Sequence, residues 1–196
     1  MRSIKIILGL LFLTAICSFG FRKNLESKRT TLKINSKLLV LDANHGLFLY
    51  KDSPFSGTAI SYSENGLESE LANFSKGKRD GLLTKYFPDG SKSFEANYTD
   101  GLLEGKSYSW WSNGNLRSES TYLNGVLHGV QKKWYQSSVL FKETNLENGK
   151  EVGIQRAWRE NGKIYVNYEA KNGRIFGLQR ANLCYQLNDE TLTYED

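Results

Sequence analysis

Short runs of alternating apolar and polar residues fill most of this 196-residue chain. Between residues 57 and 182 the runs are about five to eight residues long and rich in aromatic, Thr, Ser and β-branched side chains, which is typical of β-strands. In one such run, Tyr108 and Trp110 are expected on one side of a strand, and Ser107 and Trp111 on the other. This region shows no sustained helical period, so the pattern predicts an all-β protein.

The chain also repeats itself every 24 residues. Each unit begins with a glycine, at Gly57, Gly81, Gly105, Gly129, Gly153 and Gly177. Five residues after the glycine comes an aromatic column, formed by Tyr62, Tyr86, Trp110, Trp134 and Trp158. A fixed period of this length indicates an array in which every unit is one supersecondary element.

Two turn signals divide each unit. In residues 81–104 they are Asp89-Gly90 and Asp100-Gly101, and other units carry Asn-Gly at the same places. Asn-Gly and Asp-Gly supply the positive φ angles that tight hairpin turns require. Each unit is therefore predicted to be a β-hairpin, and the array a single-layer antiparallel β-meander of about ten strands.

The ends of the chain differ from the array. A basic start, a short apolar run from Ile6 to Ile16 and a cluster of small residues resemble a secretory signal peptide over residues 1–20. This predicts export to the periplasm, the cell envelope or the extracellular space. Cys17 could instead carry lipid, or the segment could remain as an uncleaved anchor. If Cys17 leaves with the signal peptide or carries lipid, Cys184 is the one cysteine left to pair, so no intramolecular disulfide is expected.

We expect the remaining segments to fall into four parts: a basic linker at 21–37, a capping hairpin at 38–56, the array of five units and a truncated sixth at 57–182, and a closing strand with an acidic tail at 183–196. The linker could contact an anionic membrane surface or simply be solvated. The atypical ends would protect the exposed edges of a repeat sheet from pairing with other polypeptides.

Chemistry-bearing residues are sparse in the array. No His/Cys cluster with ligand spacing is present, so we predict no metal and no cofactor. Glu95, Glu119 and Glu143 recur at one repeat position; a glycan hydrolase could use such carboxylates, but contacts on a strand face are the simpler interpretation. We therefore predict a protein that is not an enzyme. The mixed charge of the repeats argues against nucleic-acid binding.

A second set of aromatic residues is the candidate partner-binding site. Phe87, Trp111 and Tyr135 each follow a residue of the aromatic column and are expected on the opposite face of the sheet. There they could dock a peptide, a glycan or a lipid surface. The alternative is that these rings pack, because a one-layer sheet has little else to bury.

One unit carries a recognisable pattern in full: Gly105, Trp110, Trp111, Asn113-Gly114, Glu119, Tyr122, Asn124-Gly125 and Gly129. This pattern resembles the MORN repeat, specifically the bacterial MORN-variant family, whose members are commonly described as antitoxin components of toxin–antitoxin modules. The resemblance covers about residues 57–182, with Ser138, Asn167 and Ala170 as departures. It implies a single twisted β-sheet that binds and does not catalyse. Two functions are then open: a protein-binding or scaffolding module of the cell envelope, or an antitoxin-like protein that neutralises a cognate toxin by binding it.

Overall fold

The computed structural model describes residues 31–178, 187–188 and 191–192. The chain divides into two units, Met1–Thr30 and Thr31–Asp196. The predicted signal peptide with Cys17, most of the basic linker, Cys184 and most of the acidic tail lie outside the described residues. Leu187, predicted in the closing strand, lies in strand β18 (Leu187–Asn188), which pairs with β19 (Thr191–Leu192) in a separate two-stranded sheet.

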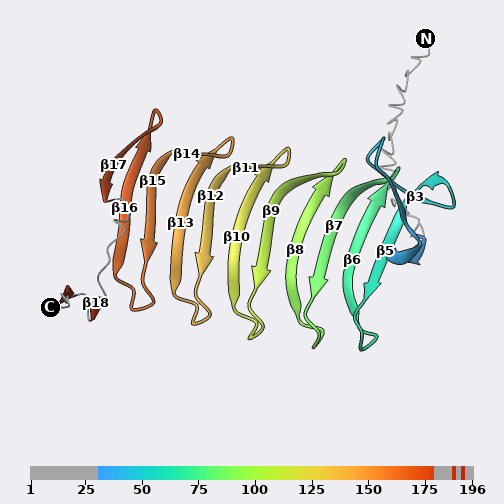
Figure 1. The fold of residues 1–196 in the computed structure, drawn as a ribbon, viewed down its shortest axis with the longest axis horizontal. Coiled ribbons are helices and arrows are strands. Elements are labelled where there is room, and N and C mark those ends of the chain that lie inside the picture. The colour runs from blue at the N-terminus through green and yellow to red at the C-terminus, as the bar shows by residue number, and fades with distance from the viewer. Residues whose placement is uncertain (1–30, 179–186, 189–190, 193–196) are drawn as a thin grey trace, which may run out of the picture. The chain divides into compact units, whose positions relative to one another are not determined.

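The array forms one antiparallel meander within a 14-stranded sheet, as predicted (Figure 1). Its main strands are β5 (Gly57–Tyr62), β6 (Glu68–Ser75), β7 (Lys78–Tyr86), β8 (Lys92–Thr99), β9 (Leu102–Trp110), β10 (Leu116–Leu123), β12 (Gly129–Trp134), β13 (Leu140–Glu147), β15 (Gly153–Trp158), β16 (Ile164–Lys171) and β17 (Arg174–Leu178). Short strands β11 (Val126–Leu127) and β14 (Lys150–Glu151) pair with β10 and β13. Consecutive long strands from β5 to β17 are neighbours, so each pairing among them is local in sequence.

Both predicted turns are tight and require positive φ. At the first, the Gly90 N–H donates to the Phe87 carbonyl at 2.9 Å, and Gly90 has φ of 84°. At the second, Asp100 and Gly101 have φ of 51° and 90°, the left-handed pair of a type I′ hairpin turn. The positive φ explains why Asn or Asp precedes glycine at this turn in most units.

Successive second turns are joined to each other. The N–H of Gly101, Gly125 and Gly149 donates to the carbonyl of Arg79, Leu103 and Leu127, respectively, at 2.8 to 2.9 Å. Side chains follow the same step: a Cβ added to Gly125 would lie 3.4 Å from Leu102 Cδ2, and one added to Gly149 would lie 3.4 Å from Val126 Cγ1. These glycines therefore provide the turn conformation and also the space for a side chain of the preceding unit.

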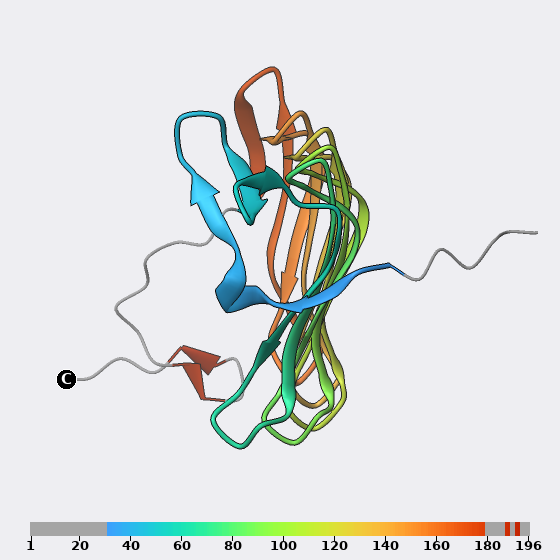
Figure 2. The same ribbon diagram turned by 90° about the vertical axis from the view of Figure 1, so that its right-hand side faces the viewer.

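The N-terminal end carries a cap that is larger than the predicted hairpin. Residues 38–56 contain three short strands, β2 (Val40–Asp42), β3 (Leu47–Tyr50) and β4 (Ser53–Pro54), which form a sheet of their own. Before them, β1 (Lys33–Asn35) and the short 3-10 helix η1 (Ser36–Leu38) occupy the end of the segment expected to be linker. Strand β1 pairs in parallel with β5 and so occupies the edge of the main sheet. In Figure 2 the cap strands lie to one side of the main sheet.

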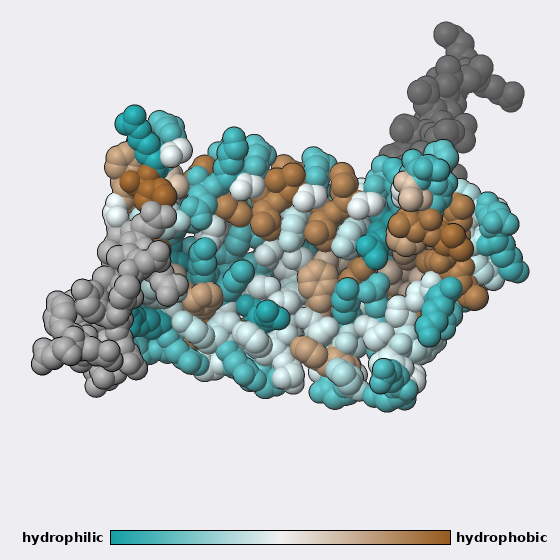
Figure 3. Space-filling model, in the orientation of Figure 1, coloured by the Kyte–Doolittle hydropathy of each residue, from teal (hydrophilic) through white to brown (hydrophobic). Residues whose placement is uncertain are grey.

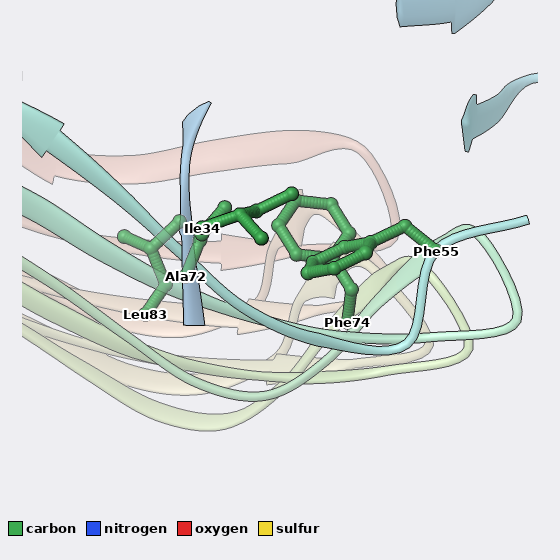
Figure 4. Packing of buried hydrophobic residues seen from close by; sticks show 6 residues of the cluster. Ile34, Phe55, Ala72, Phe74 and Leu83 are labelled. Atoms are coloured by element: carbon green, nitrogen blue, oxygen red, sulfur yellow. The ribbon is translucent and has the colours of Figure 1, made fainter. Parts of the chain in front are cut away.

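A compact apolar core lies beneath the cap. It comprises the buried residues Ile34, Phe55, Ala59, Ala72, Phe74 and Leu83, with Leu39, Phe48, Tyr50, Phe94 and Tyr98 packed against them. The centroid of the Phe74 ring lies 5.7 Å from that of Phe55 (Figure 4). On its other contact, the Phe74 centroid lies 5.1 Å from that of Phe48. The array itself is one layer, as predicted, but the cap adds a second layer over its first units, where the apolar residues of the cap and of the sheet face each other.

Candidate interaction surface

Strand register assigns side chains to the two faces of the main sheet. Across β7 and β8, Leu83 lies opposite Ala96, and Leu82 lies opposite Asn97. Residues opposite each other share a face, and neighbours along a strand alternate. We call the face with Leu83 and Ala96, which the core residues share, the cap face. The other face, with Leu82 and Asn97, is called the outer face.

The outer face carries a row of exposed aliphatic side chains close to the second turns. Its members are Leu82, Leu102, Leu123, Val126, Val130 and Ile154, which share this face by register. Each is between 43% and 51% exposed. We call these six residues the aliphatic stripe. A row of this length is more than the scattered single apolar residues of an ordinary surface.

Ion pairs lie beside the stripe on the same face. Lys106 Nζ is 2.6 Å from Glu119 Oε1, and this hydrogen bond raises the pKa of Lys106. Glu143 Oε2 lies 3.7 Å from Lys132 Nζ, and Glu143 Oε1 lies 4.0 Å from Arg156 Nη1. The recurring glutamates therefore contact cations of their own or neighbouring strands, in agreement with the simpler interpretation of that column.

The predicted aromatic column lies on the outer face as well. Tyr108 and Trp110 are two residues apart on β9, and their ring centroids are 6.1 Å apart. Tyr86, Trp134 and Trp158 occupy the same position in their units and are half-buried, whereas Tyr62 is 47% exposed. The outer face thus bears an aliphatic stripe, a row of ion pairs and an aromatic column side by side.

Two of the three candidate partner-binding rings connect neighbouring units. Trp111 Nε1 donates to the Trp134 carbonyl at 3.2 Å, and the Arg117 guanidinium lies 4.7 Å from the centroid of the Trp111 ring. The Tyr135 hydroxyl donates to the Trp158 carbonyl at 3.0 Å. Burial is the main cause of the raised pKa of Tyr135.

All three rings, including Phe87, are half-buried. Packing between units therefore accounts for Trp111 and Tyr135, while binding of a partner by these residues stays a prediction.

Two buried glutamines on the cap face were not expected. Two residues after the first five repeat glycines, the column reads Ala59, Leu83, Ser107, Gln131 and Gln155. Gln155 is fully buried; its Nε2 donates to the carbonyls of Asn145 and Val152 at 3.0 and 2.9 Å, and its Oε1 accepts from the Asn145 N–H at 3.0 Å. Gln131 bonds to Thr121 and His128 in the same way. The side-chain amides therefore complete the ladder where the strands separate.

The cap has an apolar surface of its own. Leu38, Val40 and Leu41 are each more than half exposed, and Figure 3 shows hydrophobic side chains gathered over the end of the sheet that bears the cap. We call these three residues the cap patch. Val40 and Leu41 belong to β2, which pairs with β3 alone among the described strands. The cap patch is thus a second surface that a partner could cover.

Within the part of the protein that the structure describes, no three or more His, Cys, Asp and Glu residues come together as a metal site. Across those same residues, no helix has the length and apolar character needed to cross a membrane. The outer face in the described region presents aliphatic, aromatic and paired charged side chains.

Comparison with known proteins bears on one unit of the array. No curated protein matches the chain. The family model described as the MORN repeat variant matches residues 103–124, which span most of β9 and all of β10. MORN repeats are generally modules that bind proteins or membranes. Because the columns of this unit recur every 24 residues along the sheet, the match supports a MORN-repeat family for this protein.

Proposed function

We propose that this protein is a non-catalytic, exported scaffold that binds a protein partner through the outer face of its sheet. The observation that carries the proposal is the aliphatic stripe, whose six side chains remain about half in water after folding. Burial of apolar area stabilises a complex by roughly 25 cal/mol for each Å². A partner that covers the stripe would gain this energy without any rearrangement of the sheet.

The surroundings of the stripe favour a protein over a sugar as the partner. Beside it are the ion pairs of Lys106 and Glu119 and the aromatic column, so an apolar strip is bordered by charge and by rings. Protein interfaces combine an apolar centre, aromatic anchors and a polar rim in this way. A glycan would need many hydrogen-bonding groups, and aliphatic side chains supply none.

The N-terminal sequence supports a location for this protein. The resemblance of residues 1–20 to a signal peptide supports export, and the basic residues that follow would allow peripheral contact with an anionic membrane. An antitoxin-like role would use the same kind of protein-binding surface, and the two functions differ in the partner alone. Identification of the partner therefore decides between them.

The test is capture followed by binding of the purified partner. Full-length protein serves as bait in envelope fractions, and enriched proteins are purified and titrated by calorimetry against the wild type and a Val130→Lys, Ile154→Lys variant. We expect the variant to lose about tenfold or more in affinity, because charges replace two apolar contacts of the stripe. Circular dichroism establishes that the variant keeps the fold.

Two further variants complete the design. Leu67→Lys, at a residue 48% exposed in the first turn of the first unit, is the matched control and should bind like the wild type. Val40→Lys places the same charge on the cap patch. Failure to enrich any protein would contradict the proposal, and loss of binding in Val40→Lys with retention in the stripe variant would show that the stripe is the wrong surface.

A further inference from the structure

Arg79 departs from the 24-residue period at a position where the array otherwise favours apolar residues. The same position holds Leu103, Leu127 and Ile175 in three other units. In the remaining unit it holds Glu151, whose carboxylate accepts a hydrogen bond from the Tyr168 hydroxyl at 2.6 Å. Folding alone would be served by leucine, so the guanidinium of Arg79 calls for another explanation.

The surroundings of Arg79 hold its guanidinium without neutralising it. Its central carbon lies 5.6 Å from the centroid of the Phe48 ring and 5.7 Å from that of the Tyr98 ring. Its Nε is buried and has no hydrogen-bond acceptor within the described part of the protein. No carboxylate of the described residues forms an ion pair with it. A buried N–H donor of a charged group without an acceptor is uncommon in folded proteins.

A hollow of about 200 Å³ lies at this point, between the cap and the second turns. Its lining includes Gly46, Phe48, Lys78, Arg79, Asp100 and Leu102. Backbone hydrogen bonds fix its walls: the Phe48 N–H donates to the Gly77 carbonyl at 2.7 Å, and the Gly101 N–H donates to the Arg79 carbonyl at 2.8 Å. The hollow is therefore formed before any ligand arrives.

Charge in the hollow is positive. Lys78 Nζ lies 3.0 Å from Asp100 Oδ1, so one cation is paired. Arg79 remains as an uncompensated positive charge, with an aromatic wall on one side and the aliphatic side chain of Leu102 at the rim. Guanidinium groups donate charge-assisted hydrogen bonds to carboxylates, so a carboxylate is the acceptor that suits Arg79.

We propose that the hollow binds a carboxylate borne by an apolar peptide segment, either the C-terminal carboxylate of a polypeptide or an acidic side group. The volume is below the roughly 300 Å³ at which pockets for larger ligands begin, so it fits a single residue. The origin of that residue in a protein partner rests on the proposed function, whereas the capacity to bind a carboxylate does not. Arg79 lies opposite Phe74 and therefore on the cap face, whereas the stripe is on the outer face; Leu102, which lines the hollow, is the residue at which the two sites adjoin.

The test uses small probes and NMR on the full-length protein. N-acetylleucine carries a terminal carboxylate, and the α-amide of N-acetylglutamate carries its carboxylate at the γ position of the side chain. N-acetylleucinamide is the matched control probe, because it has no carboxylate. We expect a saturable shift of the Arg79 Nε–Hε signal and of the Gly101 amide signal with at least one carboxylate probe and none with the amide. The stronger of the two carboxylate probes identifies the source.

Two variants that the array itself suggests complete the test. Arg79→Leu installs the residue of neighbouring units and should abolish the shift at Gly101. Asp100→Asn installs the asparagine that stands at this turn position in three other units, as Asn124, Asn148 and Asn172. This variant should bind the probe about threefold more strongly or better, because the carboxylate of Asp100 no longer competes with that of the probe. Equal shifts with the amide probe, no saturable shift, or an unchanged Gly101 shift in Arg79→Leu would each overturn the proposal. None of these results depends on whether the stripe binds a partner.

Discussion

The two ends of the array bury the same column of side chains by different physical means. Under the cap, Ala59 and Leu83 are each 3% exposed and lie in or against the apolar core. Farther along, Gln131 and Gln155 are 7% and 0% exposed and bond to the backbone. The strand pairing differs as well: Leu83 lies opposite Ala72 in the continuous strand β7, whereas β10 pairs with β12 only at Ser118–Lys133 and Glu119–Lys132 and Gln131 bonds to Thr121 instead. The repeat therefore does not dictate how its interior positions are satisfied.

This difference shows why the sheet can extend beyond its cap. An apolar side chain gains free energy only where a second layer removes it from water. The amide of Gln155 needs no such layer, because its partners are Asn145 and Val152 of the adjacent strand and turn. Hydrogen bonding within the array thus replaces a second layer in the later units.

The largest effect should come from the core under the cap. Phe74→Ala is expected to cost about 3–5 kcal/mol, because Phe74 contacts both Phe48 and Phe55. Leu146→Ala, at the same repeat position in a unit beyond the cap, should cost about 1 kcal/mol because Leu146 is half-buried. Urea unfolding followed by circular dichroism measures both. Equal costs would remove the distinction between the two ends.

Exchanging the two kinds of buried side chain, apolar under the cap and amide in the later units, should lower the stability of the protein in either region. Gln155→Leu leaves the Asn145 N–H without its acceptor and removes the side-chain donor to the Val152 carbonyl, and we expect a loss of about 2–4 kcal/mol in stability. Leu83→Gln buries an amide under the cap, with a similar expected loss. Hydrogen exchange at the Asn145 amide should accelerate in the first variant alone. Tolerance of either exchange would mean that the two regions are interchangeable.

Alkaline pH should weaken the far end selectively. Burial first, and then the hydrogen bond to Glu151, raise the pKa of Tyr168 from 10.0 to about 12. Below pH 10 the folded and unfolded states both keep this proton. Between pH 10 and 12 the unfolded state releases it and the folded state retains it, so stability falls by about 1–3 kcal/mol.

Tyr168→Phe isolates this contribution from those of the other titrating groups. Stability curves against pH for the variant and the wild type should diverge between pH 10 and 12, with the variant losing less. Parallel curves over that range would contradict the assignment.

The smallest expected effect concerns the links between units. Tyr135→Phe removes the hydroxyl that donates to the Trp158 carbonyl and should cost about 1 kcal/mol. Thermal unfolding measures the loss. If Tyr135→Phe leaves stability unchanged, packing no longer explains this ring, and its predicted role in partner binding becomes the stronger interpretation.

The repeat architecture could be predicted from sequence because its determinants are local. Positive φ at Asp100 and Gly101 follows from the Asp-Gly pair, and the face shared by Tyr108 and Trp110 follows from strand alternation. Both features depend on residues within one hairpin. Because the same turns and alternation recur in every unit, the assignment of strands and turns is firmer than one hairpin alone would allow.

The cap and the buried glutamines could not be predicted in the same way. Strand β1 has one buried residue, Ile34, and pairs in parallel with β5 more than twenty residues away. Glutamine is usually exposed, so Gln155 carried no sign of burial. Arg79 did give a signal, since it stands where Leu103 and Leu127 stand in other units. A residue that departs from the 24-residue period marks a position where folding or function requires a different side chain from that of the other units.

The contact between neighbouring second turns has a consequence for how such a protein changes over generations. Gly125 accommodates Leu102, and Gly149 accommodates Val126, each one unit earlier in the sequence. A duplicated stretch of 24 residues would find the same partners before and after it, whereas an insertion of another length would set a bulky side chain against the turn. Gene duplication can therefore lengthen the protein by whole hairpins, and its reach across a partner is a quantity that selection can adjust in fixed steps.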